Sequence, residues 1–240
     1  MAEQEVIKHT KKIYKSLTDK EQTFWHKAKE FTLEVFIIVF AVSISIWFHS
    51  MSEHSHQQKD VKEFLLGLKN DLRNDLKEMK EDRKMYVSNR TAFAYLTAVG
   101  TNGKLNADSL KLYGNFFFNA TGLLANNGRY EGFKSSGKIG TIENLELQND
   151  IMDLYQENIP TLIAFTNYHS DTKAKFTDYY NENYKRSGKG DNLAQILVTD
   201  RAQNIAADLG RVNNIIRQYD KCIQNIDKIY QQITLAYPNE

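Results

Sequence analysis

An apolar segment over residues 31–51, FTLEVFIIVFAVSISIWFHSM, constrains this chain more than any other feature. Its first 18 residues carry one charge, Glu34. A helix of that length rises about 27 Å, which nearly matches the roughly 30 Å hydrocarbon core of a bilayer. Trp25 and Trp47 fall near the two interfaces, where indole rings prefer to lie. The sequence therefore predicts a transmembrane helix over 31–51, with the lipid bilayer as a partner.

Two other interpretations of this segment are disfavoured. A cleavable signal peptide has a brief basic leader and a small-residue cleavage site, whereas here 30 mostly polar residues precede the segment and HSMSEH follows the apolar run. A buried core helix of a water-soluble domain would carry a polar face, which is missing between Val35 and Phe48. A membrane anchor is the better interpretation.

Lysines on either side of the span predict its orientation, because Lys and Arg near a span are retained in the cytoplasm. Residues 1–30 carry seven lysines, whereas the first twenty residues after Met51 carry three. We therefore expect residues 1–30 in the cytoplasm and residues 52–240 outside the cytoplasmic membrane. Residues 6–29 are typical either of a basic amphipathic helix on the inner leaflet or of a solvated helix that continues into the span.

The composition limits the partners and the chemistry of the outer part. With 41% hydrophobic residues, 25% charged residues and a formal net charge of +1, the chain resembles an ordinary folded domain and has no basic field for nucleic acid. The single cysteine, Cys222, lies at an apolar position of a helical pattern, so no internal disulfide can form. A catalytic thiol is disfavoured there, because no His is in helical register with it.

The distribution of prolines and glycines predicts long helices. Only Pro160 and Pro238 occur, and most of the 12 glycines cluster near residues 100–103, 128–140 and 188–190. The first long helix, 55–98, has an apolar stripe of Val61, Leu65, Leu68, Leu72, Leu76, Met79 and Tyr86. Its other faces are expected to be solvated and carry Asp71, Asp75, Lys77, Lys80, Glu81 and Lys84.

Two further long helices are expected over 142–184 and 192–234. The former would begin after Thr141 as its N-cap and be kinked at Pro160. A shorter aromatic helix is expected over 108–125, with one more short helical turn before Gly140.

The predicted fold class is all-α, with one N-terminal transmembrane helix followed by an elongated antiparallel bundle of three long helices and one or two short ones. The domains are a cytoplasmic tail (1–30), the span (31–51) and an extracytoplasmic bundle (52–240). The first long helix could continue directly out of the span, because no proline or glycine separates Met51 from Gly67. Its stripe could also serve a coiled coil between chains, and the small residues Ala41, Ser43 and Ser45 permit close helix approach in the span.

Several segments resemble an uncharacterised family of bacterial single-pass membrane proteins, a domain of unknown function. They are Glu34-Val35 opening the span, a tryptophan at its outer end, LLGLKNDLRNDLKEM over 65–79, and YEGFKSSGKIGTIENLELQNDIMDLY over 130–155. Ser135-Ser136-Gly137 is the most specific part. The resemblance implies a Gram-negative inner-membrane protein with a periplasmic helical domain, and it brings no activity.

Four local features are candidate sites. Glu34 lies about one turn inside the span, where an ionisable residue is costly. It could contact a partner helix, take part in a proton pathway, or extend to the cytoplasmic interface without a specific role. His49, Glu53, His54 and His56 at the outer interface could hold zinc or copper, although the spacing of known sites is missing and a polar interface turn is favoured. The loop over 135–140 lacks phosphate-binding spacing and is interpreted as a turn that caps the next helix. Phe116, Phe117 and Phe118 cannot all face one core, so at least one should contact another element, a ligand or a subunit.

Two classes of function remain. The first is a structural or accessory subunit that uses its span to contact other inner-membrane proteins or a second copy of itself, with Trp25, Glu34, Ala41, Ser45 and Trp47 at the interface. The second is a periplasmic sensor that binds a ligand and signals through a separate partner, since a cytoplasmic tail of about thirty residues is too short for a catalytic domain of typical size. An enzyme is not expected, nor is a cofactor, because no paired carboxylates, activated nucleophile or closed metal spacing stands out.

Overall fold

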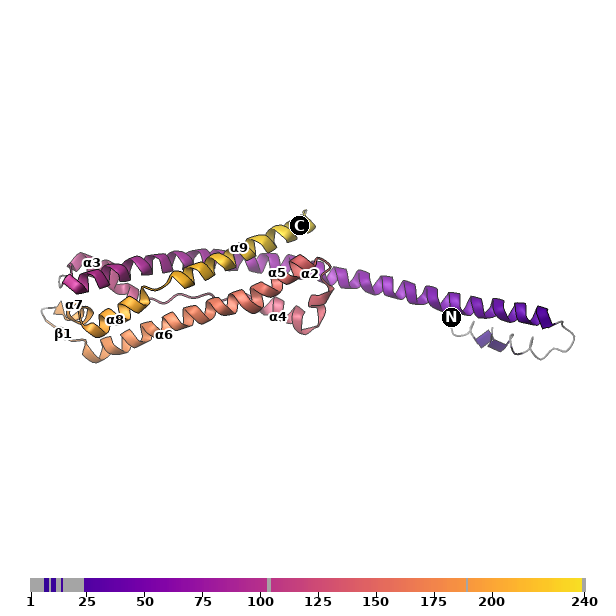
Figure 1. The fold of residues 1–240 in the computed structure, drawn as a ribbon, viewed down its shortest axis with the longest axis horizontal. Helices are drawn as coiled ribbons and strands as arrows, with labels where there is room; N and C mark the ends of the chain where they lie inside the picture. Colours follow the sequence, from indigo (N-terminus) through magenta and orange to yellow (C-terminus); the bar gives the residue numbers. More distant parts are fainter. Residues whose placement is uncertain are drawn as a thin grey trace. The chain divides into compact units, whose positions relative to one another are not determined.

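The computed structural model describes residues 24–102, 105–188 and 190–238, together with residues 7, 8, 10, 11 and 14 (Figure 1). The predicted amphipathic tail lies mostly outside the described residues. The chain divides into two compact units, Met1–Asp60 and Val61–Glu240. Apart from two strands of two residues each, the regular elements of the described chain are helical, which confirms the all-α fold class.

The longest element is α2, a 79-residue helix from Phe24 to Asn102. It contains both the predicted span and the first predicted long helix, so the expected continuation between them is confirmed. Within the second unit, its apolar stripe is buried as expected. The stripe residues that are at most 3% exposed are Val61, Leu65, Leu68, Leu72, Met79 and Tyr86.

Two other helical arms pack on this stripe. One arm consists of α5, a π-helical turn η3, and α6; the other ends in α8 and α9. Their bounds are Leu145–Asp153, Leu154–Asn158 and Ile159–Asn183 for the first arm, and Asp200–Leu209 and Asn213–Ala236 for the second. The buried core between the arms includes Ile151, Leu154, Leu162, Tyr219, Cys222, Ile226 and Ile229.

The α9 helix runs antiparallel to α2. Arg73 of α2 donates a hydrogen bond to Tyr230, whereas Arg83, further along α2, pairs with the earlier residue Asp220 at 2.5 Å. Residue numbers that rise along α2 therefore meet residue numbers that fall along α9.

The α6 helix runs parallel to α2, so the predicted antiparallel order is wrong for this pair. The rings of Tyr86 and His169 meet edge to face at 5.2 Å, and Lys173 lies 5.9 Å from the ring of Phe93. Residue numbers therefore rise in the same direction along α2 and α6. The order differs because residues 105–144 return along the bundle before α5 begins (Figure 1).

This returning segment is largely not a long helix. It contains α3 (Ala107–Tyr113), the 3-10 turn η1 (Gly114–Phe117), a non-helical stretch over 118–127, α4 (Gly128–Ser135) and the 3-10 turn η2 (Lys138–Thr141). The helix predicted over 108–125 is therefore wrong beyond Phe117. The stretch FNATGLLANN is rich in Asn, Thr and Gly, which are poor helix formers. The expected short helical turn before Gly140 is confirmed by α4.

The helix predicted over 142–184 begins later than expected, at Leu145 of α5. Asn144, rather than Thr141, is its N-cap, and the Asn144 side chain accepts a hydrogen bond from the Leu147 backbone. Pro160 is accommodated by the wider turn η3 just before it. A proline ring clashes with the carbonyl four residues earlier and offers no N–H, so a π-helical turn relieves both problems.

The third long helix, predicted over 192–234, is broken into three. Before α8 lies α7, Leu193–Leu197, and Thr199 caps α8 by accepting a hydrogen bond from the backbone of Ala202. Gly210 ends α8, and α9 begins at Asn213. The break predicted near 188–190 is confirmed as an antiparallel pair of strands, β1 (Arg186–Ser187) and β2 (Gly190–Asp191).

Candidate functional site

The predicted span exposes apolar side chains around the whole helix. Over residues 31–51 only Glu34 and Ile38 are not exposed, and Phe36, Ile46 and Trp47 are each at least 60% exposed. A core helix would instead bury such side chains against its own fold. This part of α2 is the one helix in the described chain that is long and apolar enough to cross a membrane.

The two tryptophans flank this apolar surface. Trp25 is 79% exposed and Trp47 is 60% exposed, and their separation of 22 positions corresponds to about 33 Å along a helix. This separation is close to the thickness of a hydrocarbon core. Both rings are therefore spaced to lie at opposite interfaces.

One face of the span carries the residues singled out for helix contact. Glu34, Ala41 and Ser45 follow one another at spacings of seven and four, which return to the same face of a helix. Glu34 is only 8% exposed, unlike its neighbours Leu33 and Val35. The Ser45 hydroxyl donates a hydrogen bond to the Ala41 carbonyl at 2.9 Å, which satisfies it without a partner chain.

The histidines at the predicted outer interface are spread over an exposed stretch of α2. His49, Glu53, His54 and His56 are all exposed, and Glu53 accepts a hydrogen bond from Gln57 at 3.5 Å. In the described ranges, no group of three or more His, Cys, Asp or Glu side chains is arranged to hold a metal ion.

The loop over 135–140 ends a helix. Gly137 has a φ of 73°, and its amide donates to the Lys134 carbonyl at 2.9 Å while the Ser136 amide donates to Gly132. A glycine in the left-handed region commonly ends an α-helix in this way. The prediction of a turn is confirmed, although the helix it caps is α4, the one before it.

Phe116, Phe117 and Phe118 have different environments, as expected for three consecutive residues that cannot all face one core. Phe117 is 1% exposed and stacks on Phe176 with ring centroids 3.9 Å apart, whereas Phe118 is 40% exposed and meets Tyr180 edge to face. Phe116 is half-buried beside Tyr113. They therefore pack on α6 and on their own segment.

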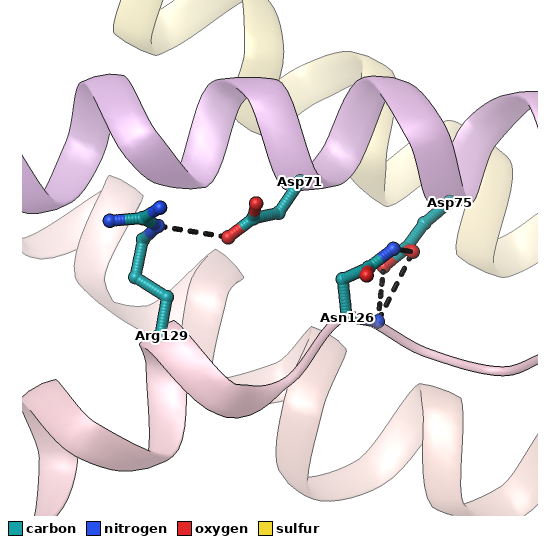
Figure 2. Close-up of polar contacts among 4 residues, drawn as sticks. All are labelled: Asp71, Asp75, Asn126 and Arg129. Atoms are coloured by element: carbon teal, nitrogen blue, oxygen red, sulfur yellow. Dashed lines mark hydrogen bonds and ion pairs between the residues drawn. The ribbon is translucent and has the colours of Figure 1, made fainter.

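Sequence reasoning missed a row of acidic side chains on α2 that holds the non-helical stretch. Asp71, Asp75, Glu78 and Asp82 follow at spacings of four, three and four, which place them on one face. Asp71 pairs with Arg129 at 2.9 Å, and Asp75 accepts hydrogen bonds from Asn126 (Figure 2). The expectation that Asp71 and Asp75 are solvated is wrong, since Asp75 is fully buried and Asp71 is half-buried.

The row continues into a buried polar cluster. Glu78 accepts a hydrogen bond from the Leu124 backbone, and Asp82 accepts hydrogen bonds from Thr121 and from the Tyr219 hydroxyl. Burial and the Asp82 carboxylate raise the pKa of Tyr219. These carboxylates accept hydrogen bonds from backbone and hydroxyl donors of the segments packed on α2, which is a structural task.

A cavity of about 420 Å³ lies where α6 passes the break between α8 and α9. It is lined by Phe165, Tyr168, His169, Thr172, Asp208, Leu209, Arg211, Asn214 and Ile215. His169 is 5% exposed, and its Nε2 lies 3.3 Å from the Leu209 carbonyl. Burial, together with the nearby Lys173 ammonium, lowers the pKa of His169 to about 4, so its ring is neutral at pH 7.

The thiol of Cys222 is not suited to nucleophilic chemistry. It is fully buried among the apolar side chains of the bundle core, and this burial raises its pKa to about 12. Because the thiolate is the nucleophile, such a thiol is inert at neutral pH. The interpretation of Cys222 as a core residue is confirmed.

The chain matches no protein-family model, no curated protein and no solved structure. The resemblance to the uncharacterised single-pass family therefore stays a prediction that rests on the motifs alone.

Proposed function

We propose that this protein is a single-pass protein of a bacterial inner membrane, with a periplasmic helical domain, and that it acts as a structural or accessory subunit of an envelope membrane complex. The observation that carries this proposal is the surface of α2 over residues 31–51, which is apolar on all sides and exposed. Such a surface is stable in lipid or against other membrane helices. The excess of lysines before the span supports a cytoplasmic N-terminus.

The face formed by Glu34, Ala41 and Ser45 supports helix contacts as the means of assembly. Small residues spaced four apart let the backbones of two transmembrane helices approach closely. A carboxyl near the end of a span is costly in lipid and favours a location against another helix. The partner is a membrane helix, either of another inner-membrane protein or of a second copy of this chain.

The experiment is purification of the full chain from its native membrane in a mild detergent, with matched span variants. Ala41→Leu combined with Ser45→Leu adds bulk to the proposed contact face. Ser43→Leu adds the same side chain on the opposite face, because two residues turn a helix by about 200°. We expect a stoichiometric membrane partner with the wild type and with Ser43→Leu, and loss of that partner with the double variant.

Two results would contradict the subunit role. One is purification as a lone monomer from the native membrane under conditions that preserve known complexes. The other is a partner retained equally by the double variant, since it would then bind elsewhere. Carbonate extraction checks that each variant is still integral to the membrane.

A further inference from the structure

We propose that the cavity between α6 and the α8–α9 break binds a small organic carboxylate with an aromatic or aliphatic body. Its volume of about 420 Å³ falls within the roughly 300–1,000 Å³ of small-molecule sites. This inference goes beyond the proposed subunit role and does not depend on it.

The walls of the cavity suit an apolar body. Phe165, Leu209 and Ile215 line it, the latter two almost fully buried, and Phe165 is 38% exposed. Phe165 belongs to α6 and Ile215 to α9, so both helices contribute an apolar wall to the cavity. Burial of such a group would be favoured by about 25 cal/mol per Å² of apolar surface removed from water.

The deep part of the cavity carries no charge at neutral pH. His169 is neutral, and because a carbonyl can only accept, the contact with Leu209 fixes the ring proton on Nε2. Thr172 donates its hydroxyl to the Tyr168 carbonyl. A charged ligand group would therefore lie at the mouth rather than at His169.

The mouth favours an anion. The Asp208 carboxylate accepts a hydrogen bond from the Tyr168 hydroxyl at 3.2 Å, and the Arg211 guanidinium lies 3.9 Å from it, an ion pair beyond hydrogen-bonding distance. Arg211 has a 79% exposed side chain and five N–H donors, so most of its donors can face a ligand carboxylate.

The start of α9 adds to this preference. In the described chain, no side chain caps the first turn of α9, and that turn holds no acidic residue. Its backbone N–H groups carry the partial positive charge of a helix N-terminus, close to Arg211, Asn214 and Ile215 of the lining. The mouth thus offers a ligand carboxylate one guanidinium, that of Arg211, and the start of α9. The Asp208 carboxylate at the same mouth already accepts a hydrogen bond from Tyr168.

The test uses the full chain in lipid nanodiscs and two probes of equal size, 3-phenylpropionate and 3-phenylpropylamine. Binding is measured by saturation-transfer NMR, with empty nanodiscs as the background. We expect 3-phenylpropionate to bind and 3-phenylpropylamine to show no signal above background. Arg211→Gln should weaken 3-phenylpropionate by about tenfold or more, the scale of one charge-assisted hydrogen-bonded pair, whereas Arg211→Lys should keep part of the affinity.

Matched variants separate the site from general surface effects. Arg201→Gln removes the same charge from α8 outside the lining and should leave binding unchanged. Phe165→Ala removes an apolar wall that is already partly exposed and should weaken binding without unfolding the chain, which near-ultraviolet circular dichroism checks. Equal binding of the amine, no binding of the carboxylate to the wild type, or an unchanged affinity in Arg211→Gln would each overturn the proposal.

Discussion

Asp75 of α2 is fully buried and accepts hydrogen bonds from both the backbone and the side-chain amide of Asn126, which lies 51 residues later in the chain (Figure 2). The backbone amide lies 3.2 Å from Asp75 Oδ1. A non-helical stretch packed on a helix must find partners for its own N–H groups, and here carboxylates of α2 supply them. Asp75 is therefore a structural residue that fixes the path of residues 118–127.

Replacing this carboxylate should destabilise the second unit. Asp75→Ala removes the buried carboxylate that accepts part-buried hydrogen bonds from the backbone and side-chain amides of Asn126, and hydrogen bonds to a charged group contribute about 1.5–3 kcal/mol of unfolding free energy. Urea unfolding of the full chain in detergent, followed by circular dichroism, measures the loss. Glu81→Ala, at an exposed position of the same helix, is the matched control and should change the unfolding free energy by less than about 0.5 kcal/mol. Equal effects of the two variants would refute the structural role of Asp75.

Burial of His169 should make the fold sensitive to mild acid. Its pKa is lowered from 6.5 to about 4 in the folded chain, so between these values the unfolded chain binds the extra proton. Stability from this residue is therefore complete above pH 6.5 and is lost as the pH falls toward 4, by on the order of 3 kcal/mol. Unfolding free energies at pH 7 and pH 4.5 measure this loss.

A histidine variant isolates the contribution. His169→Gln should reduce the difference between pH 7 and pH 4.5, whereas the exposed His56→Gln should leave it as in the wild type. If both variants keep the wild-type difference, the acid sensitivity comes from other groups.

Burial of Lys173 should make the unfolding free energy depend on pH in the alkaline range. It is 5% exposed, it donates to the Asn119 carbonyl, and burial lowers its pKa from 10.5 to about 8. Between those values the unfolded chain binds more protons than the folded chain, so stability from this group rises as the pH goes from 8 to 10. Lys173→Met should remove that rise, and Lys175→Met, two residues away and exposed, should keep it. Unfolding free energies of both variants and the wild type, measured at pH 7.5 and pH 9.5, test this difference.

The thiol of Cys222 gives a direct probe of bundle integrity. Because it is fully buried and its pKa is raised to about 12, a maleimide should label it only after the bundle opens. Labelling followed by mass spectrometry should rise together with urea unfolding. Rapid labelling of the folded chain at pH 7 would contradict the position of Cys222 in the core. Asp75→Ala should speed labelling, since it destabilises the same unit.

Much of the helical pattern could be predicted because apolar periodicity reports the core directly. The stripe from Val61 to Tyr86 is buried as the spacing indicates, and the break near Gly188 is found where the glycines predict it. Thr199 followed by Asp200 is a typical helix start, and this pair of residues indicates the beginning of α8 within the segment predicted as one helix over 192–234.

The path of the chain between helices was harder to predict. Polar periodicity does not reveal which face another segment covers. It therefore predicts solvent contact for Asp71 and Asp75, which instead bind Arg129 and Asn126. The parallel order of α2 and α6 could not be predicted for a similar reason. The sequence indicates a helix over 108–125, whereas residues 118–127 are non-helical and the segment 105–144 returns along the bundle. The cavity beside His169 depends on a helix break at Gly210 that a single glycine signals only weakly.

The most direct test of the account is the side of the membrane on which each end of α2 lies. In a Cys222→Ala background, Lys8→Cys and Lys175→Cys place single thiols at exposed positions before and after the span. A membrane-impermeant maleimide applied to intact spheroplasts should label Lys175→Cys at once and Lys8→Cys only after the membrane is permeabilised. Labelling of Lys8→Cys but not Lys175→Cys in intact spheroplasts, or labelling of both, would contradict a span over 31–51 with the helical bundle outside.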